Sequence, residues 1–187
     1  MYYIPYYGNV PMYNYGDQLV YWTLPNQIGY ANRADPSRFS NDESIVLKDY
    51  GTLPLVINLE KAAKQNDNYR TTLWTGNKLQ LTLMSINVGE DIGLEIHPNV
   101  DQFLYIEQGE GLAQMGPSKN NLNYERMVQD DYAVIVPAGT WHNVTNTGSV
   151  PLKLYSIYAP PNHPFGTVHV TKADAMTSEA GYGSGNQ

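Results

Sequence analysis

Residues 95–102 read Glu-Ile-His-Pro-Asn-Val-Asp-Gln and combine a short β-strand pattern with metal-binding types of side chain. Residues two apart in a strand point to the same face, so we expect the Glu95 carboxylate and the His97 imidazole to project into one space. Pro98 and Asn99 predict a turn after that strand. Gln102 then opens the next antiparallel strand, near enough to face the same space.

A second candidate ligand lies about 40 residues further along the chain. His142 follows the predicted turn Pro137-Ala138-Gly139. Two imidazoles, one carboxylate and one amide oxygen suit a divalent metal ion of borderline-hard character, such as Mn, Fe, Zn or Ni. Asp101 is an alternative to Gln102 as the fourth ligand, although the alternation of side chains along the strand favours Gln102.

Short strand patterns separated by Gly and Pro extend outward from this stretch in both directions. The chain thus predicts an all-β antiparallel sandwich or barrel, preceded by one short helix at residues 59–64 that Asn58 caps. The expected strands are residues 79–87, 94–97, 102–107, 112–115, 132–136, 142–145 and 152–158.

The composition divides the 187 residues into three regions. Residues 1–40 form an arm rich in Tyr, Pro and Asn, without the periodicity of a strand or helix. Residues 41–172 are the expected β-barrel domain, and residues 173–187 form a Gly-rich tail that we expect to be flexible. We expect a homodimer through exposed sheet edges, with a larger assembly through the arm as an alternative.

Charge and cysteine content restrict the classes of partner and site. The net charge is −7 and there is no basic cluster, which argues against nucleic acid and anionic membrane surfaces as partners and favours a small-molecule substrate. The chain has no cysteine, so thiolate metal sites and disulfides are excluded. Without a signal-peptide pattern, we expect a cytoplasmic protein, with spore association as the alternative.

The paired motifs resemble those of the cupin superfamily. The first motif of that family is G-x5-H-x-H-x3–4-E-x6-G, and this chain has Gly89, Glu95-Ile96-His97, Gln102 and Gly109 at those spacings. The second motif is G-x5-P-x-G-x2-H-x3-N, and this chain has Asp131, Pro137-Ala138-Gly139, His142 and Asn146. The resemblance covers about residues 75–160 and implies a double-stranded β-helix, or jelly-roll, barrel with a metal in its pocket.

Three positions depart from the family pattern. Glu95 stands where the family usually has its first His, Gln102 where it has Glu, and Asp131 where the second motif begins with Gly. The carboxylate and the neutral ligand are in effect exchanged between two positions, so the total ligand charge of −1 is kept and a divalent ion still fits.

The resemblance leaves three functions open. The first is a metal-dependent enzyme on a small polar substrate such as a sugar, similar to cupins labelled mannose-6-phosphate isomerase-like, with Glu95 as the candidate catalytic base. The second is an iron-dependent dioxygenase of the quercetinase type, for which two His and one carboxylate also suffice. The third is a non-catalytic structural or assembly protein, similar to spore-coat proteins in its Tyr-rich arm.

Several neighbouring side chains are candidates for shaping the pocket. Trp141, Tyr105 and Tyr155 could face it or fill the core. His163 and His169 lie beyond the predicted barrel, and we expect both to have loop roles.

Overall fold

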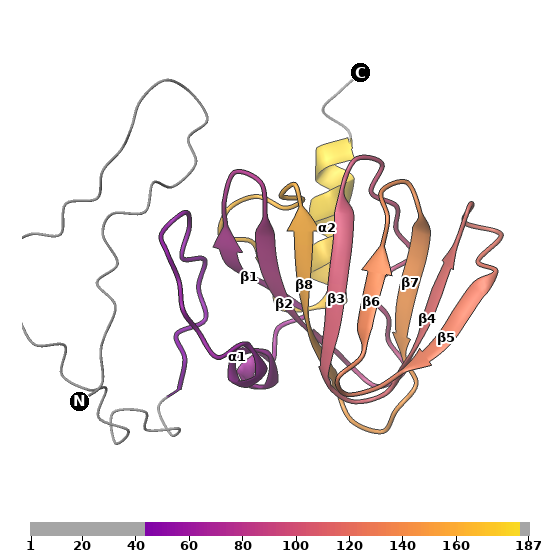
Figure 1. The fold of residues 1–187 in the computed structure, drawn as a ribbon, viewed down its shortest axis with the longest axis horizontal. Coiled ribbons are helices and arrows are strands. Elements are labelled where there is room, and N and C mark those ends of the chain that lie inside the picture. Colours follow the sequence, from indigo (N-terminus) through magenta and orange to yellow (C-terminus); the bar gives the residue numbers. More distant parts are fainter. Residues whose placement is uncertain (1–43, 184–187) are drawn as a thin grey trace, which may run out of the picture. The chain divides into compact units, whose positions relative to one another are not determined.

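The computed structural model describes residues 44–183 and consists mainly of two antiparallel sheets (Figure 1). The larger sheet has six strands in the order β6-β3-β8-β2-β1-β9, and the smaller has three in the order β5-β4-β7. The strands are β1 (Arg70–Thr75), β2 (Gln80–Ile86), β3 (Asp101–Gln108), β4 (Gly111–Gly116), β5 (Tyr124–Val128), β6 (Ala133–Val136), β7 (Trp141–Asn146), β8 (Leu152–Ala159) and β9 (Val168–His169), and the helices are α1 (Leu59–Gln65) and α2 (Lys172–Gly183).

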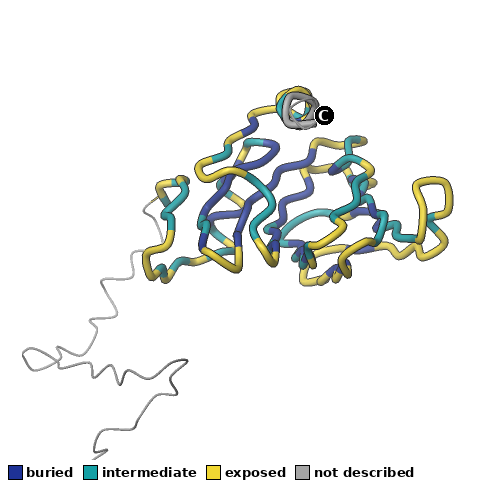
Figure 2. Tube along the Cα trace, turned by 90° about the horizontal axis from the view of Figure 1, so that it is seen from above, coloured by how far each residue is buried: buried dark blue, intermediate teal, exposed yellow. Residues whose placement is uncertain are grey.

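The main hydrophobic core draws residues from both sheets. Leu104 and Ile106 of β3 and Leu154 of β8 belong to the same buried cluster as Ala113 of β4 and Val144 of β7. In β3 and β7 every second residue is buried, as expected for strands with one face on a core. Figure 2 shows this burial concentrated along the strands, with exposed segments at many of the turns. The alternation that predicted the strands therefore also supplies the core.

A second cluster covers part of the outer face of the larger sheet. Ala62 and Ala63 of α1 pack with Leu81 and Leu83 of β2. The helix begins where predicted, because the Asn58 side chain accepts a hydrogen bond from the Lys61 backbone N–H at 2.9 Å. Since β2 is covered on both faces, all of its residues are buried.

The expected strand at residues 94–97 is reduced to one bridge. Glu95 pairs with His142 of β7, and both backbone N–H···O distances between them are 3.0 Å. Strands β1, β5 and β9 were not predicted from the sequence. Each of these strands is defined by its pairing with a neighbour. β1 pairs with β2 and β9 in the larger sheet, and β5 pairs with β4 in the smaller one.

The C-terminal segment differs from the flexible tail expected over residues 173–187. Most of it forms helix α2, which starts with a reciprocal cap: the Thr171 N–H donates to the Asp174 carboxylate and the Asp174 N–H donates to the Thr171 hydroxyl. Ala175 is buried in the main core, so the folded domain continues past the expected boundary at residue 172. The Thr171-x-x-Asp174 pattern is typical of a helix start, whereas the glycines at residues 181–185 favoured a flexible tail.

Other expectations fall on residues that the structure does not describe. The Tyr-rich arm at residues 1–40, with the assembly role suggested for it, and residues 184–187 lie outside the described range. Within residues 44–183, no helix is long and apolar enough to cross a membrane.

Asp131 occupies a backbone conformation that explains the glycine of the family motif. Its φ is +69°, and it is the one non-glycine residue with positive φ in the described chain. Aspartate tolerates this left-handed region better than most residues. The Asp131 N–H donates to the Ile106 carbonyl at 2.9 Å, so the substitution keeps the turn into β6.

Candidate metal centre

The segment that carries Glu95 and His97 is fixed between the two motifs. Besides the Glu95–His142 bridge, the Ile92 N–H donates to the Val144 carbonyl at 3.0 Å. At the other end, the His97 carbonyl accepts a hydrogen bond from the Gly139 N–H at 2.9 Å, and Gly139 has φ +76°. A glycine is favoured there because other residues are strained in that conformation. The two motifs are therefore joined by backbone hydrogen bonds.

Three of the predicted ligands come together in the folded chain. Glu95, His97 and His142 each present one ligand atom, and these atoms lie within 4.8 Å of one another. The Glu95 Oε1 atom is 3.3 Å from Nε2 of His97 and 3.3 Å from Nε2 of His142. The His142 side chain is 1% exposed and the Glu95 side chain 17%, so the cluster is buried but opens on one side.

The hydrogen bonding and the spacing of the donor atoms suit a bound metal ion. Among residues 44–183, neither the His97 Nε2 nor the His142 Nε2 atom has a hydrogen-bond partner, although both are buried. Buried polar atoms are rarely left without a partner. Ligand atoms at about 2.1 Å from one ion stand about 3.0–3.4 Å apart at octahedral to tetrahedral angles, which matches the measured 3.3 Å. The Glu/His/His cluster can therefore hold a metal ion, whose identity the ligand set leaves open.

The tautomer of His142 suits a ligand. Its Nδ1 atom lies 2.9 Å from the Thr140 carbonyl oxygen, which can only accept a hydrogen bond. Nδ1 therefore carries the proton, and Nε2 presents a lone pair toward Glu95. Metal-binding imidazoles are commonly oriented through the second nitrogen in this way.

Gln102 and Asp101 lie on opposite faces of β3. Gln102 is buried, its Nε2 atom donates to the Ser156 hydroxyl at 3.0 Å, and its Oε1 atom has no hydrogen-bond partner among the described residues. Asp101 is exposed and accepts a hydrogen bond from the Ala138 N–H at 2.9 Å. Asp101 thus supports the Pro137–Gly139 turn, and Gln102 is the residue of the pair that offers a free buried oxygen.

The charge state of Glu95 is set by its neighbours. Burial alone raises the pKa of a carboxyl group. The close approach of both imidazoles, whose Nε2 atoms lie 3.3 Å from the carboxylate, and the nearby charge of Arg70 outweigh that effect and hold the pKa of Glu95 well below its usual range. The carboxylate is therefore ionised at neutral pH, as a metal ligand must be.

The cluster opens into a cavity of about 780 Å³, within the usual range for small-molecule sites. His163 and His169 line this cavity together with Glu95 and His97. His163 lies in a loop as expected, whereas His169 belongs to β9, and the position of both at the cavity was not predicted. The lining residues are Glu95, Ile96, His97, Pro161, Asn162, His163, Pro164, Thr167, Val168, His169 and Ser178.

The aromatic side chains of β8 divide between the surroundings of His97 and the outer surface. The Tyr158 ring is buried with its centroid 5.7 Å from that of His97 and 5.0 Å from that of His163. Tyr155 instead stacks on Tyr105 at 5.3 Å on the face that bears α1, and neither tyrosine lines the cavity. Trp141 does not line it either. Alternation along β8 from Leu154 was the signal that could have identified Tyr158.

A fully buried glutamine fixes the loop that carries His163. The Gln80 Oε1 atom of β2 accepts hydrogen bonds from the N–H groups of Asn162 at 3.2 Å and His163 at 2.9 Å. Its Nε2 atom donates to the His163 carbonyl at 2.8 Å and to the Thr75 hydroxyl at 3.0 Å. One side chain thus uses all of its hydrogen-bonding capacity to hold residues 162–163 beside the metal centre.

We expect His163 to make stability depend on pH. Burial, followed by the charge of Arg70, lowers the pKa of His163 from 6.5 to about 3. Between these values the unfolded chain binds a proton that the folded chain does not, so the unfolding free energy falls as the pH drops below 6.5. This single group contributes a slope of up to ~1.4 kcal/mol per pH unit.

The measurement is urea unfolding in EDTA between pH 4.5 and 7.5, comparing the chain with His163→Gln. The variant has no titrating group at this position, so its stability should depend less steeply on pH. Parallel curves would show that His163 is not held neutral.

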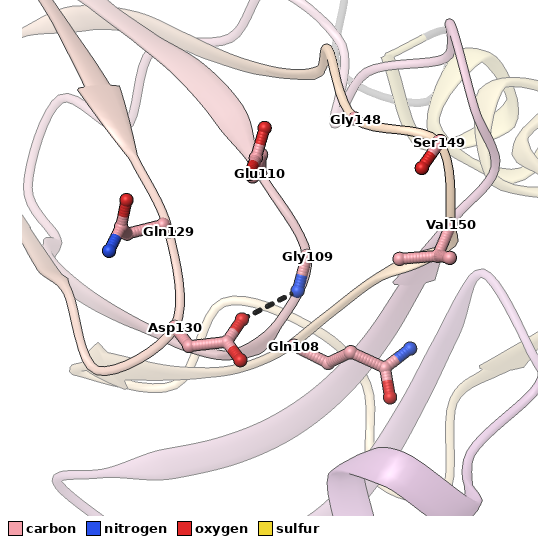
Figure 3. Close-up of a pocket in the computed structure, with 8 residues that line it drawn as sticks. All are labelled: Gln108, Gly109, Glu110, Gln129, Asp130, Gly148, Ser149 and Val150. Atoms are coloured by element: carbon pink, nitrogen blue, oxygen red, sulfur yellow. Dashed lines mark hydrogen bonds between the residues drawn. The ribbon is translucent and has the colours of Figure 1, made fainter.

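A separate polar pocket lies at the other end of β3 from Gln102 (Figure 3). It is formed by the turns around Gly109, Asp130 and Ser149, and the Asp130 carboxylate accepts a hydrogen bond from the Gly109 N–H at 2.7 Å. No histidine lines it. This hydrogen bond makes Asp130 a support for the turn between β3 and β4.

The two antiparallel sheets define a small β-sandwich protein, and the Glu/His/His cluster gives it a candidate metal site. A family model described as a cupin domain matches residues 82–158, which contain all four predicted ligands. The chain belongs to the cupin superfamily, as the motifs predicted, and the all-β double-stranded β-helix fold class is confirmed.

Two known proteins and one solved structure are similar to this chain over most of its length. The uncharacterized protein YrkC of Bacillus subtilis (strain 168) is 61% identical over 186 residues, covering 96% of this chain and 100% of that protein. Protein L612 of Acanthamoeba polyphaga mimivirus is 37% identical over 118 residues, covering 63% of this chain and 72% of that protein. The crystal structure of BH2720 from Bacillus halodurans is 63% identical, with a TM-score of 0.69, and covers 70% of this chain and 98% of that one.

Proposed function

We propose that this protein is a metal-dependent enzyme that acts on a small, hydroxyl-rich substrate such as a sugar, in a reaction of the isomerase type. The observation that carries the proposal is a cavity that opens directly onto Glu95 and His97 of the Glu95/His97/His142 cluster and whose wall includes imidazole, amide and hydroxyl groups. Seven of its eleven lining residues have polar or ionisable side chains. Such a lining suits a substrate with several hydroxyl groups.

The charges of the lining favour an uncharged sugar over a sugar phosphate. No Lys or Arg is among the eleven residues that line the cavity. Phosphate groups are usually held by Arg, Lys or the N-terminus of a helix. The cavity instead offers imidazole, amide and hydroxyl groups, which match the neutral hydroxyls of an aldose or ketose.

The chain's own residues divide into holding and binding roles. When bound, a divalent ion would supply Lewis acidity to a substrate oxygen. His97, His142 and Glu95 would hold that ion, with the Gln102 oxygen as the fourth ligand. The lowered pKa of Glu95 makes it a better ligand than a base, so we favour its metal role over the catalytic role expected from the sequence.

A dioxygenase is the second candidate because of the ligand set. Two histidines and one carboxylate are the ligands typical of non-haem iron oxygenases. The aromatic or β-diketone substrates expected for the quercetinase type would favour a cavity with few polar side chains. We rank the isomerase first because seven of the eleven lining side chains are polar or ionisable.

Exchange of substrate hydrogen with solvent tests the proposal. The protein is loaded with Mn²⁺, Fe²⁺, Zn²⁺ or Ni²⁺ and incubated with aldoses and ketoses in D₂O, and deuterium at C2 is followed by NMR. We expect metal-dependent exchange with at least one sugar, abolished by EDTA and by His142→Ala. Oxygen consumption with a flavonol, in the absence of sugar exchange, would instead establish the dioxygenase.

A further inference from the structure

His163 lines the cavity, and one polar atom of its side chain is unused. Its Nε2 atom is buried and has no hydrogen-bond partner among the described residues. The same residue lines the cavity onto which Glu95 and His97 open. A buried ring nitrogen without a partner is costly, and a bound molecule that supplies the missing hydrogen bond would remove that cost.

The position of this imidazole is fixed in advance of binding. Gln80 holds the backbone of His163 through both its N–H and its carbonyl. The ring packs edge-on against Tyr158, with an interplanar angle of 89°, and Tyr158 also contacts His97. The His163 side chain is therefore linked to the metal centre through one buried ring, and it is preorganised to receive a ligand group.

The charge state of His163 defines the chemistry of the group that it would bind. Burial and the nearby charge of Arg70 keep its pKa low, so the ring is neutral at neutral pH. A neutral imidazole nitrogen either accepts or donates one hydrogen bond, according to the tautomer. A hydroxyl group complements both tautomers, whereas a carboxylate or phosphate would be stabilised mainly by a protonated ring.

We propose that His163 is the residue that recognises a neutral hydroxyl group of the substrate while another part of that substrate lies at the metal centre. The inference rests on the proposed function and assigns to the loop after β8 a role in selecting polyols and sugars. Gln80 is then the positioning residue for His163.

The test measures binding of neutral polyols to the Mn²⁺-loaded protein by water-proton relaxation. The probes are erythritol, xylitol, d-lyxose and d-mannose, and the variants are His163→Phe, which keeps a ring without a hydrogen-bonding atom, and His163→Gln. Thr177→Ala is the control, because Thr177 lies on α2 but does not line the cavity, and its hydroxyl donates to the Ala173 carbonyl.

We expect His163→Phe to weaken binding of at least one probe by about 10- to 100-fold, while His163→Gln retains most of the affinity. Thr177→Ala should stay within about twofold. The Mn²⁺ affinity of all three variants should stay within the same factor. Unchanged probe binding in His163→Phe would overturn the proposal, and so would a loss of Mn²⁺ affinity comparable to that of His142→Ala.

Two further outcomes separate this inference from the proposed function. If the chain binds Mn²⁺ but none of the probes, the metal centre stands and hydroxyl recognition by His163 is refuted. If the chain binds no Mn²⁺, the proposed function fails, and calorimetry with the same probes and variants on the metal-free protein still decides the role of His163.

Discussion

Replacing His142 by alanine is expected to reduce the metal content of the purified protein from near one ion per chain to below about one tenth. His142 is the most deeply buried member of the cluster, and its Nε2 atom lies 3.3 Å from the Glu95 carboxylate. Removing this imidazole takes away one of the three ligands of the cluster, so that only Glu95 and His97 remain to hold the ion. Changes even to the partners of metal ligands commonly cost 10- to 100-fold in affinity, and loss of a ligand costs at least as much.

The measurement is elemental analysis of protein purified without added metal, together with a Zn²⁺ or Mn²⁺ titration. His97→Ala should behave like His142→Ala. His169→Ala is the matched control, because it removes an imidazole from the same cavity but outside the cluster, and it should keep its metal. Equal sub-stoichiometric metal in the unaltered chain and in both ligand variants would show that the cluster is not a metal site.

Replacing Gln80 by alanine is expected to lower the unfolding free energy by about 3 kcal/mol. The Gln80 side chain is fully buried and makes four hydrogen bonds, three of which hold the backbone of residues 162–163. Alanine leaves these backbone groups without partners and opens a cavity beside β2. Part of the cost is recovered if the loop moves and binds water.

Urea unfolding measures the stability change, and hydrogen exchange of residues 160–167 measures the loosening of the loop. Gln114→Ala is the control, since Gln114 is a half-buried strand glutamine whose amide pairs with Glu125. It should change stability by less than about 0.5 kcal/mol. If Gln80→Ala destabilises the protein no more than Gln114→Ala does, Gln80 is not the positioning residue for the His163 loop.

The local pattern of the sequence predicted the central strands because their burial alternates. The expected strands at residues 102–107, 142–145 and 152–158 correspond to β3, β7 and β8, and Asn58 caps α1 as expected. β1 was missed because no alternation marks it: its residues 70–73 are all buried, although three of them are polar or charged. A strand between two others is stabilised by its neighbours, and this contribution is not visible in its own residues.

The candidate metal ligands were accessible from the sequence because each lies at a position where local geometry is restrictive. Glu95 and His97 are two residues apart in an extended segment, and His142 follows a turn that needs a positive φ at Gly139. The choice between Gln102 and Asp101 followed from strand alternation, and the structure leaves Gln102 buried and Asp101 bonded to Ala138. Each of these features depends only on residues that are close together in the sequence.

The sequence alone therefore determined the family, most of the strands and the residues that form the candidate metal cluster. Tertiary structure decided what surrounds that cluster, because His163 and His169 reach the cavity, and Tyr158 packs against His97 and His163, only in the folded chain. The bonds from Gln80 to His163 join residues 83 positions apart. No local pattern specifies such a contact, since it depends on a buried amide finding free backbone groups only after both sheets have formed.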